Sequence, residues 1–339
     1  MASDRRLPLQ GGLPPMEGVG GVVEIACDES GFSGSNMLDA ATPVFTHASV
    51  DLSVDEAVEL IGVLRSGFRR SWTELKSGTF LRGPQAGEAL GRLLAALDGR
   101  AHVLVVDKEY FLVTRIVDLF LTEPSYAAGT RLTQERRPAA LALYRGGRAA
   151  DGREWRAFLA AFVELVRTKR TRPMDHHAVL RFFQARDALQ RVGLGGEADD
   201  VLDGLDRARV GEVLTRLAHD DRSIPPPLEP MLPALAETVL FWSGGQHRVL
   251  VIHDEQSALT AGRLRRLQQV LTDGAALAGR VSPLAGLVTV DSRDDPRIQV
   301  ADLLAGVARQ ERNDGDDSLL RPFVSPTSLH DREAMPDRS

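Results

Sequence analysis

The sequence has one cysteine, three lysines and only 5% aromatic residues in a chain of 339. A single cysteine, Cys27, cannot form an internal disulfide, and its place inside an apolar run favours a small buried side chain over a nucleophile. No apolar stretch is long enough to span a membrane, and the first residues lack the apolar segment of a secretory signal. We therefore expect a cytoplasmic protein.

The basic residues are almost all arginine, and they are unevenly distributed. The formal net charge is -6, which argues against a protein that coats nucleic acid. Residues 131–172 nevertheless hold eleven Arg or Lys against four Asp or Glu, whereas residues 197–221 hold eight acids against three Arg. A basic run in the first region either contacts nucleic acid or offsets a helix dipole. The candidate contacts are Arg167, Lys169, Arg170 and Arg172.

Four short apolar runs rich in Val and Ile each lead to an aspartate, at Asp28, Asp107, Asp254 and Asp291. Runs of this length, separated by helical patterns, are typical of buried strands in a largely parallel sheet. Ligands of such sheets bind at the carboxyl ends of the strands, so the four carboxylates are candidates for one rim. A divalent metal would neutralise their mutual repulsion. A helix cap or a turn is the competing interpretation of each aspartate taken alone.

The order of the patterns predicts an α/β protein with an all-helical insertion. Strand and helix patterns alternate over residues 21–122 and return over residues 246–311. Only helical patterns occur between them, over residues 123–245. Residues 1–20 are rich in Gly and Pro and predict a disordered leader, and residues 312–339 are polar and predict a flexible tail.

Asp302 interrupts the apolar face of the last helical pattern. Its neighbours on that face are Ile298, Ala305 and Gly306, so the carboxylate lies on a stripe that would pack against the sheet. Burial of an unpaired carboxylate costs several kcal/mol and requires compensation. Either a metal ion shared with the strand-end acids or a buried hydrogen bond would supply it.

Two of the three lysines adjoin acidic residues. Lys76 follows Glu74 by two positions, and Lys108 follows Asp107 directly. If the first segment is extended, Glu74 and Lys76 share one face. They form either a surface ion pair or a metal ligand beside a lysine that faces phosphate.

Four motifs occur in an order that resembles the DUF3800 family, uncharacterised proteins with a ribonuclease H-like fold. They are Asp-Glu-Ser-Gly at 28–31, Glu-Leu-Lys-Ser at 74–77, Asp-Glu at 254–255, and Val-Asp-Ser followed by Ile-Gln-Val-Ala-Asp-Leu-Leu-Ala-Gly over 290–306. The resemblance spans about residues 21–310. It implies a ribonuclease H-like mixed sheet flanked by helices, with acidic residues that coordinate a divalent metal ion for phosphodiester hydrolysis. Those acids are Asp28, Glu74, Asp254 and Asp302.

The prediction is a metal-dependent nuclease that uses Mg²⁺ or Mn²⁺ and acts on DNA or RNA. Bound metal would activate a water molecule and stabilise charge on the phosphate, and Lys76 would meet the developing negative charge. Glu29, Asp291 and Lys108 are second-tier candidates, while Asp107 has no counterpart in the motif set. The alternative is a non-catalytic ribonuclease H-like module, for nucleic acid or a protein partner, whose acids are structural.

Overall fold

The computed structural model describes residues 12–13, 21–32, 34, 36–66, 77–82, 85–150, 152–167, 175–314 and 319–331. The chain divides into two compact units. Unit 1 comprises Met1–Phe32, Val44–Val105 and Ala234–Ser328. Unit 2 comprises Ser33–Pro43, Val106–Pro233 and Leu329–Ser339.

Unit 1 is built on a five-stranded mixed sheet with the strand order β3-β2-β1-β4-β5. The central strand β1 pairs in parallel with β4, and β4 pairs in parallel with β5. β2 is antiparallel to β1, so the sheet is mixed, as expected. Its connection to β1 is short, and a parallel pair would need a long crossover. The strands are β1 (Val22–Ser30), β2 (Val44–Val50), β3 (Ala101–Asp107), β4 (Arg248–His253) and β5 (Leu284–Thr289).

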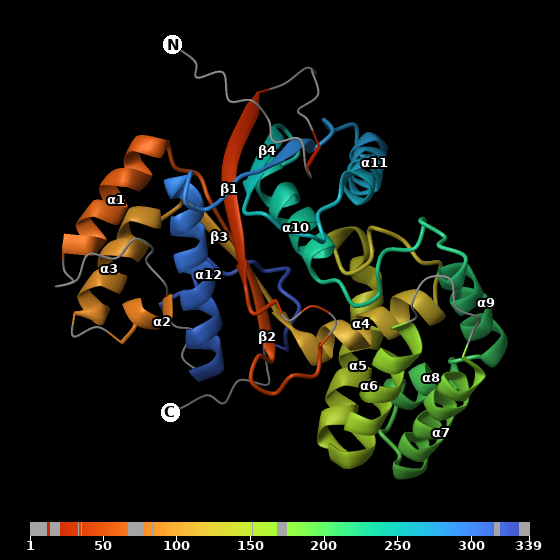
Figure 1. The fold of residues 1–339 in the computed structure, drawn as a ribbon. Coiled ribbons are helices and arrows are strands. Elements are labelled where there is room, and N and C mark those ends of the chain that lie inside the picture. The colour runs from red at the N-terminus through yellow and green to blue at the C-terminus, as the bar shows by residue number, and fades with distance from the viewer. Residues whose placement is uncertain are drawn as a thin grey trace. The chain divides into compact units, whose positions relative to one another are not determined.

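Four helices of unit 1 lie on one side of this sheet (Figure 1). They are α1 (Val54–Ser66), α2 (Ser77–Phe80), α3 (Ala86–Leu97) and α12 (Pro296–Asp314). Ala26 of β1 and Ile252 of β4 share a buried apolar core with Leu93 of α3 and Leu304 of α12. The predicted mixed sheet flanked by helices is therefore present, with α12 packed directly on the central strands.

Polar contacts join the opposite side of the sheet to α10 (Met231–Ser243), which belongs to unit 1 from Ala234 onward. Trp242 Nε1 donates to Ser49 Oγ at 2.8 Å. His47 Nδ1 lies 2.9 Å from Thr238 Oγ1. The remaining helix of unit 1 is α11 (Ala261–Leu277). Its Gln268 Nε2 donates a hydrogen bond of 2.9 Å to the Leu284 carbonyl oxygen of β5.

Unit 2 is helical in its described part, around a core in which Phe120, Phe162 and Phe182 pack together. Its helices are α4 (Lys108–Phe120), η1 (Arg131–Arg136), α5 (Arg137–Ala149), α6 (Gly152–Val166), α7 (His176–Val192), α8 (Glu197–Asp203) and α9 (Arg207–Ala218). Helical patterns in the sequence at Glu154–Val166, His176–Gln190 and Arg207–Ala218 predict α6, α7 and α9, whereas α5 and α8 were not predicted. Two consecutive glycines weaken the helical pattern of α5, and the second, Gly147, is required because a Cβ there would collide with the Trp155 ring.

The described parts of the predicted leader and tail contact the sheet. Leu13 is buried and exchanges two backbone hydrogen bonds of 2.8 Å with Leu287. Phe323 is buried, and the Ser325 N–H donates to the Val103 carbonyl oxygen at 2.7 Å. Such isolated anchors have no periodicity, which is why the sequence patterns miss them. None of the described helices combines the length and apolarity that a membrane span requires.

Candidate functional site

Asp28 lies inside β1 and not at its end, because the strand continues for two residues to Ser30. In the register, Asp28 pairs with Ala48 and Ser30 pairs with Thr46. Thr46 Oγ1 donates to the Ala305 carbonyl oxygen of α12 at 2.8 Å, so this is the face of the sheet that α12 covers. The Asp28 side chain is therefore buried beneath α12, with 7% of its surface exposed.

Glu29 follows Asp28 on the strand and points to the opposite face, as strand alternation predicted. It pairs with His47 in the register and accepts a hydrogen bond from Gln256 Nε2. Glu29 thus contributes negative charge to the surroundings of Asp28 without sharing its face of the sheet.

Three carboxylates from distant parts of the sequence act on one another here. The pKa of Asp28 is raised to about 9, first by burial, then by the charges of Glu29, Asp302 and Asp254. The Glu29 backbone N–H, which donates to Asp28 Oδ1 at 2.7 Å, opposes the increase. Asp254 and Asp302 therefore lie near enough to Asp28 for their charges to raise its pKa, after burial and Glu29.

Asp254 and Asp302 are positioned by different elements. Asp254 directly follows β4, is half-buried, and accepts a hydrogen bond at its Oδ1 from the Ser292 N–H at 3.1 Å. Asp302 is half-buried on α12 between the buried residues Ala301 and Leu303. The strand end and the helix therefore each bring one carboxylate toward the central strand.

Helix α2 packs closely against α12 one turn after Asp302. A Cβ on Gly306 would collide with the Ser77 side chain, so the contact requires glycine. Ser77 comes directly after Lys76, the predicted phosphate contact, and three residues after Glu74, the predicted metal ligand. Glu74 and Lys76 themselves lie outside the described residues.

The cap interpretation is confirmed for Asp107. Its side chain caps α4 by accepting from the Tyr110 N–H at 2.9 Å, and its Oδ2 accepts from the Tyr144 hydroxyl, also at 2.9 Å. Asp291 serves a turn, where hydrogen bonds from Arg293 lower its pKa to about 2. Both carboxylates already have strong donors.

The predicted basic residues are only partly described. Lys108 is buried at the start of α4, and its Nζ donates to Thr42 Oγ1 at 3.2 Å within unit 2. Arg167 is exposed after α6. The other predicted nucleic-acid contacts lie outside the described residues: Lys169, Arg170 and Arg172.

The donor chemistry of Asp28, Asp254 and Asp302 fits a hard divalent cation, which takes carboxylate oxygens as ligands. Asp28 Oδ2 has no hydrogen-bond donor in the described part of the chain. Within the same part, no three His, Cys, Asp or Glu side chains converge closely enough to coordinate one ion. The predicted fourth ligand, Glu74, lies outside the described residues.

Sequence reasoning missed a buried histidine pair on the Glu29 face of the sheet. His47 and His253 are fully buried, and their Nε2 atoms lie 3.2 Å apart. His253 Nδ1 lies 3.0 Å from the Asp254 carbonyl oxygen, and burial lowers the pKa of His47 well below its ordinary value. The position of His253 directly before Asp254 was the available signal, but its partner is more than 200 residues away in the sequence.

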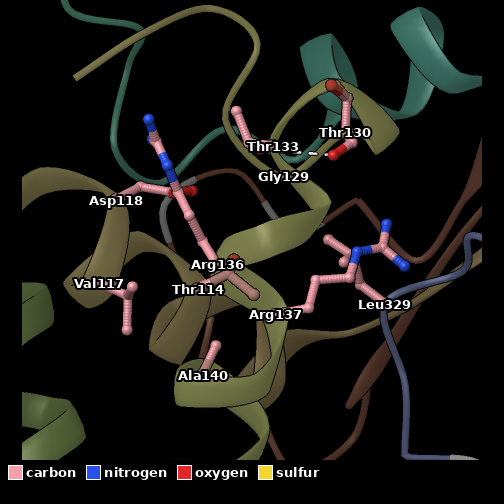
Figure 2. A pocket seen from close by; sticks show the side chains of 10 residues that line it. All are labelled: Thr114, Val117, Asp118, Gly129, Thr130, Thr133, Arg136, Arg137, Ala140 and Leu329. Atoms are coloured by element: carbon pink, nitrogen blue, oxygen red, sulfur yellow. Dashed lines mark hydrogen bonds and ion pairs between the residues drawn. The ribbon is translucent and has the colours of Figure 1, made fainter. Parts of the chain in front are cut away.

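Unit 2 contains a separate small pocket, which has a volume of only about 10 Å³ (Figure 2). Asp118 lines it, and Asp118 Oδ1 accepts from Arg136 Nη1 at 3.4 Å. Asp118 also pairs with buried Arg115, whose Nη1 lies 3.7 Å from Oδ2. A cavity of this size is at the lower limit for one water molecule and cannot admit a nucleotide.

No family model, no curated protein and no solved structure matches the chain. The resemblance to the DUF3800 family therefore rests on the four motifs. Three of them are described by the structure, and the motif at 74–77 is described only at Ser77.

Proposed function

We propose that unit 1 is a divalent-metal-dependent nuclease with a ribonuclease H-like fold. The observation that carries the proposal is the grouping of Asp28, Asp254 and Asp302, which come from the central strand, the end of its parallel neighbour and the last helix. This is the placement of acids that the resemblance to the DUF3800 family implies. The five-stranded mixed sheet with helices packed on it agrees with the same fold.

The electrostatics favour a cation at this position. Burial beneath α12, and then the charges of neighbouring carboxylates, raise the pKa of Asp28 to about 9, so without a metal ion this carboxyl group keeps its proton at neutral pH. A divalent ion would replace that proton and reverse the repulsion, because an opposite charge at close range favours the carboxylate. Asp28, Asp254 and Asp302, together with Glu74, would be its oxygen ligands.

Bound Mg²⁺ or Mn²⁺ would supply the activated water and the charge stabilisation that phosphodiester hydrolysis needs. The chain contributes the rest. Its carboxylates would fix the position of the ion, and α12 would shield Asp28 from bulk water. Lys76 would meet negative charge on the phosphate.

Cleavage assays on the full-length protein test the proposal. Labelled single- and double-stranded DNA and RNA are incubated with Mg²⁺, with Mn²⁺ or with EDTA. We expect metal-dependent cleavage that falls at least about a hundredfold in Asp28→Asn and in Asp302→Asn. Asp107→Asn, which changes the same group at a helix cap, is the matched control and should retain activity. Absence of cleavage by the wild type under every condition, or full activity of Asp302→Asn, contradicts the proposal.

The alternative function is a non-catalytic module that binds nucleic acid or a protein partner. The lack of a three-ligand group among the described residues favours it. Such a module would bind labelled nucleic acid equally well in EDTA and in Mg²⁺ and would not cleave it. The same assay therefore separates the two functions.

A further inference from the structure

Arg309 lies on α12 seven residues after Asp302, close to the end of β1. Its Nε donates to Ser30 Oγ at 3.0 Å, and the side chain is half-buried. Seven residues make nearly two helical turns, so Asp302 and Arg309 project from the same side of α12, about 10 Å apart along its axis. Ser30 in turn shares a face of β1 with Asp28. The guanidinium therefore borders the carboxylate group.

Gly31 makes room for this arginine. It has a φ of +82°, a conformation that glycine adopts without strain. A Cβ at this position would lie 2.7 Å from Arg309 Cδ and would collide with the Val44 carbonyl oxygen. The turn at the end of β1 is thus shaped so that the arginine stem can lie against its backbone.

The guanidinium group of Arg309 differs from those of Arg293 and Arg297 in its hydrogen-bond partners. Arg297 on the same helix is paired with Glu24 and Asp295, and Arg293 is paired with Asp291. Arg309 uses its Nε for Ser30, and no carboxylate within the described residues accepts from either of its Nη atoms. Two N–H groups of a planar fork are therefore available, in the geometry that matches a phosphate.

An acidic site needs positive charge to receive a polyanion. The carboxylates of Asp28, Asp254 and Asp302 repel the backbone of a nucleic acid, and a metal ion offsets this only at the reacting phosphate. Arg309 adds a fixed cation about 10 Å away along α12. Successive phosphates of one strand advance by roughly 3.4 Å along a duplex axis, so this separation reaches a phosphate at most about three nucleotides away.

We propose that Arg309 binds a backbone phosphate of the nucleic-acid substrate, about one to three nucleotides from the phosphate at the carboxylates. This inference rests on the proposed nuclease function. Ser30 orients the guanidinium through its Nε, and Gly31 admits the side chain. Arg309 is thus a substrate-binding residue that does not touch the reacting atoms.

The test measures KM and kcat on a labelled oligonucleotide of the class that the wild type cleaves, at several salt concentrations. Arg309→Gln should raise KM about tenfold with little change in kcat, and should reduce the salt dependence of binding by about one phosphate contact. Arg309→Lys should show a smaller increase, because it keeps the charge and loses the fork. Ser30→Ala, which leaves the arginine in place without its hydrogen bond, should raise KM less than Arg309→Gln does.

Arg266→Gln is the matched control, because Arg266 is a half-buried arginine of α11 whose Nη1 bonds only to its own helix. It should leave KM unchanged. If the wild type cleaves and Arg309→Gln has the KM and salt dependence of the wild type, the assignment of Arg309 is overturned and the nuclease function stands. If the wild type neither binds nor cleaves nucleic acid, the proposed function falls and the assignment falls with it.

Discussion

Replacement of Asp28 by Asn should stabilise the metal-free protein, by an amount that grows with pH. The pKa of Asp28 is about 9 in the folded protein and near 3.8 in an unfolded chain. A carboxyl group whose pKa is raised in the folded state makes its full contribution to the stability of the fold at pH values below its unfolded-state pKa. That contribution is lost as the pH rises toward the folded-state pKa. The wild type should therefore lose stability between about pH 4 and pH 9 through this one group.

The magnitude follows from the distance between the two pKa values. Each pH unit in this window corresponds to about 1.4 kcal/mol, and pH 7 lies about three units above the unfolded-state pKa, so the full effect at pH 7 is about 4 kcal/mol. Relaxation of the side chain and entry of water reduce it, so we expect Asp28→Asn to be ~1–3 kcal/mol more stable than the wild type at pH 7. Asn keeps an oxygen for the Glu29 N–H, so no hydrogen bond is lost.

Urea denaturation in EDTA, at several values between about pH 5.5 and pH 8.5, measures this difference. Asp291→Asn is the control. Its pKa is lowered to about 2, so its contribution is lost only as the pH falls below the unfolded-state pKa, and its difference from the wild type should be constant in this window. A difference between Asp28→Asn and the wild type that does not change with pH would show that Asp28 does not titrate with a raised pKa in the folded protein.

Two further substitutions concern structural acids. Asp107→Ala removes the cap of α4 and the acceptor for Tyr144, so urea denaturation should show that the free energy of unfolding falls by ~1–2 kcal/mol. The affinity for Mn²⁺ should not change. A weaker affinity would indicate that Asp107 contributes to metal binding. Asp118→Ala leaves the buried Arg115 guanidinium without its ion pair and should cost ~3–5 kcal/mol, and a loss below ~1 kcal/mol would show that the pair is not buried in solution.

Local patterns were sufficient to predict the elements that carry the candidate site. The apolar runs before Asp28 and Asp254 form β1 and β4, and the stripe around Asp302 forms a helix that packs on the sheet. These features depend on side-chain periodicity, which is a property of the sequence itself. The same patterns placed Asp28 at a strand end, although β1 continues to Ser30, because polar residues beyond the apolar run gave no signal for a strand.

Features that depend on long-range contacts could not be predicted. The His47 and His253 pair and the contact of Arg309 with Ser30 each join segments that no local pattern relates. The four acid-ended runs were equivalent in sequence, yet Asp107 is a helix cap. Only the donors around each carboxylate distinguish a cap from a candidate ligand.

Calorimetric titration of the full-length protein with Mn²⁺ at neutral pH measures metal binding by these carboxylates. We expect binding by the wild type at millimolar or lower concentration, and an affinity at least about tenfold weaker in both Asp28→Asn and Asp302→Asn. Absence of binding by the wild type, or equal affinity in all three proteins, would contradict a metal site formed by these carboxylates.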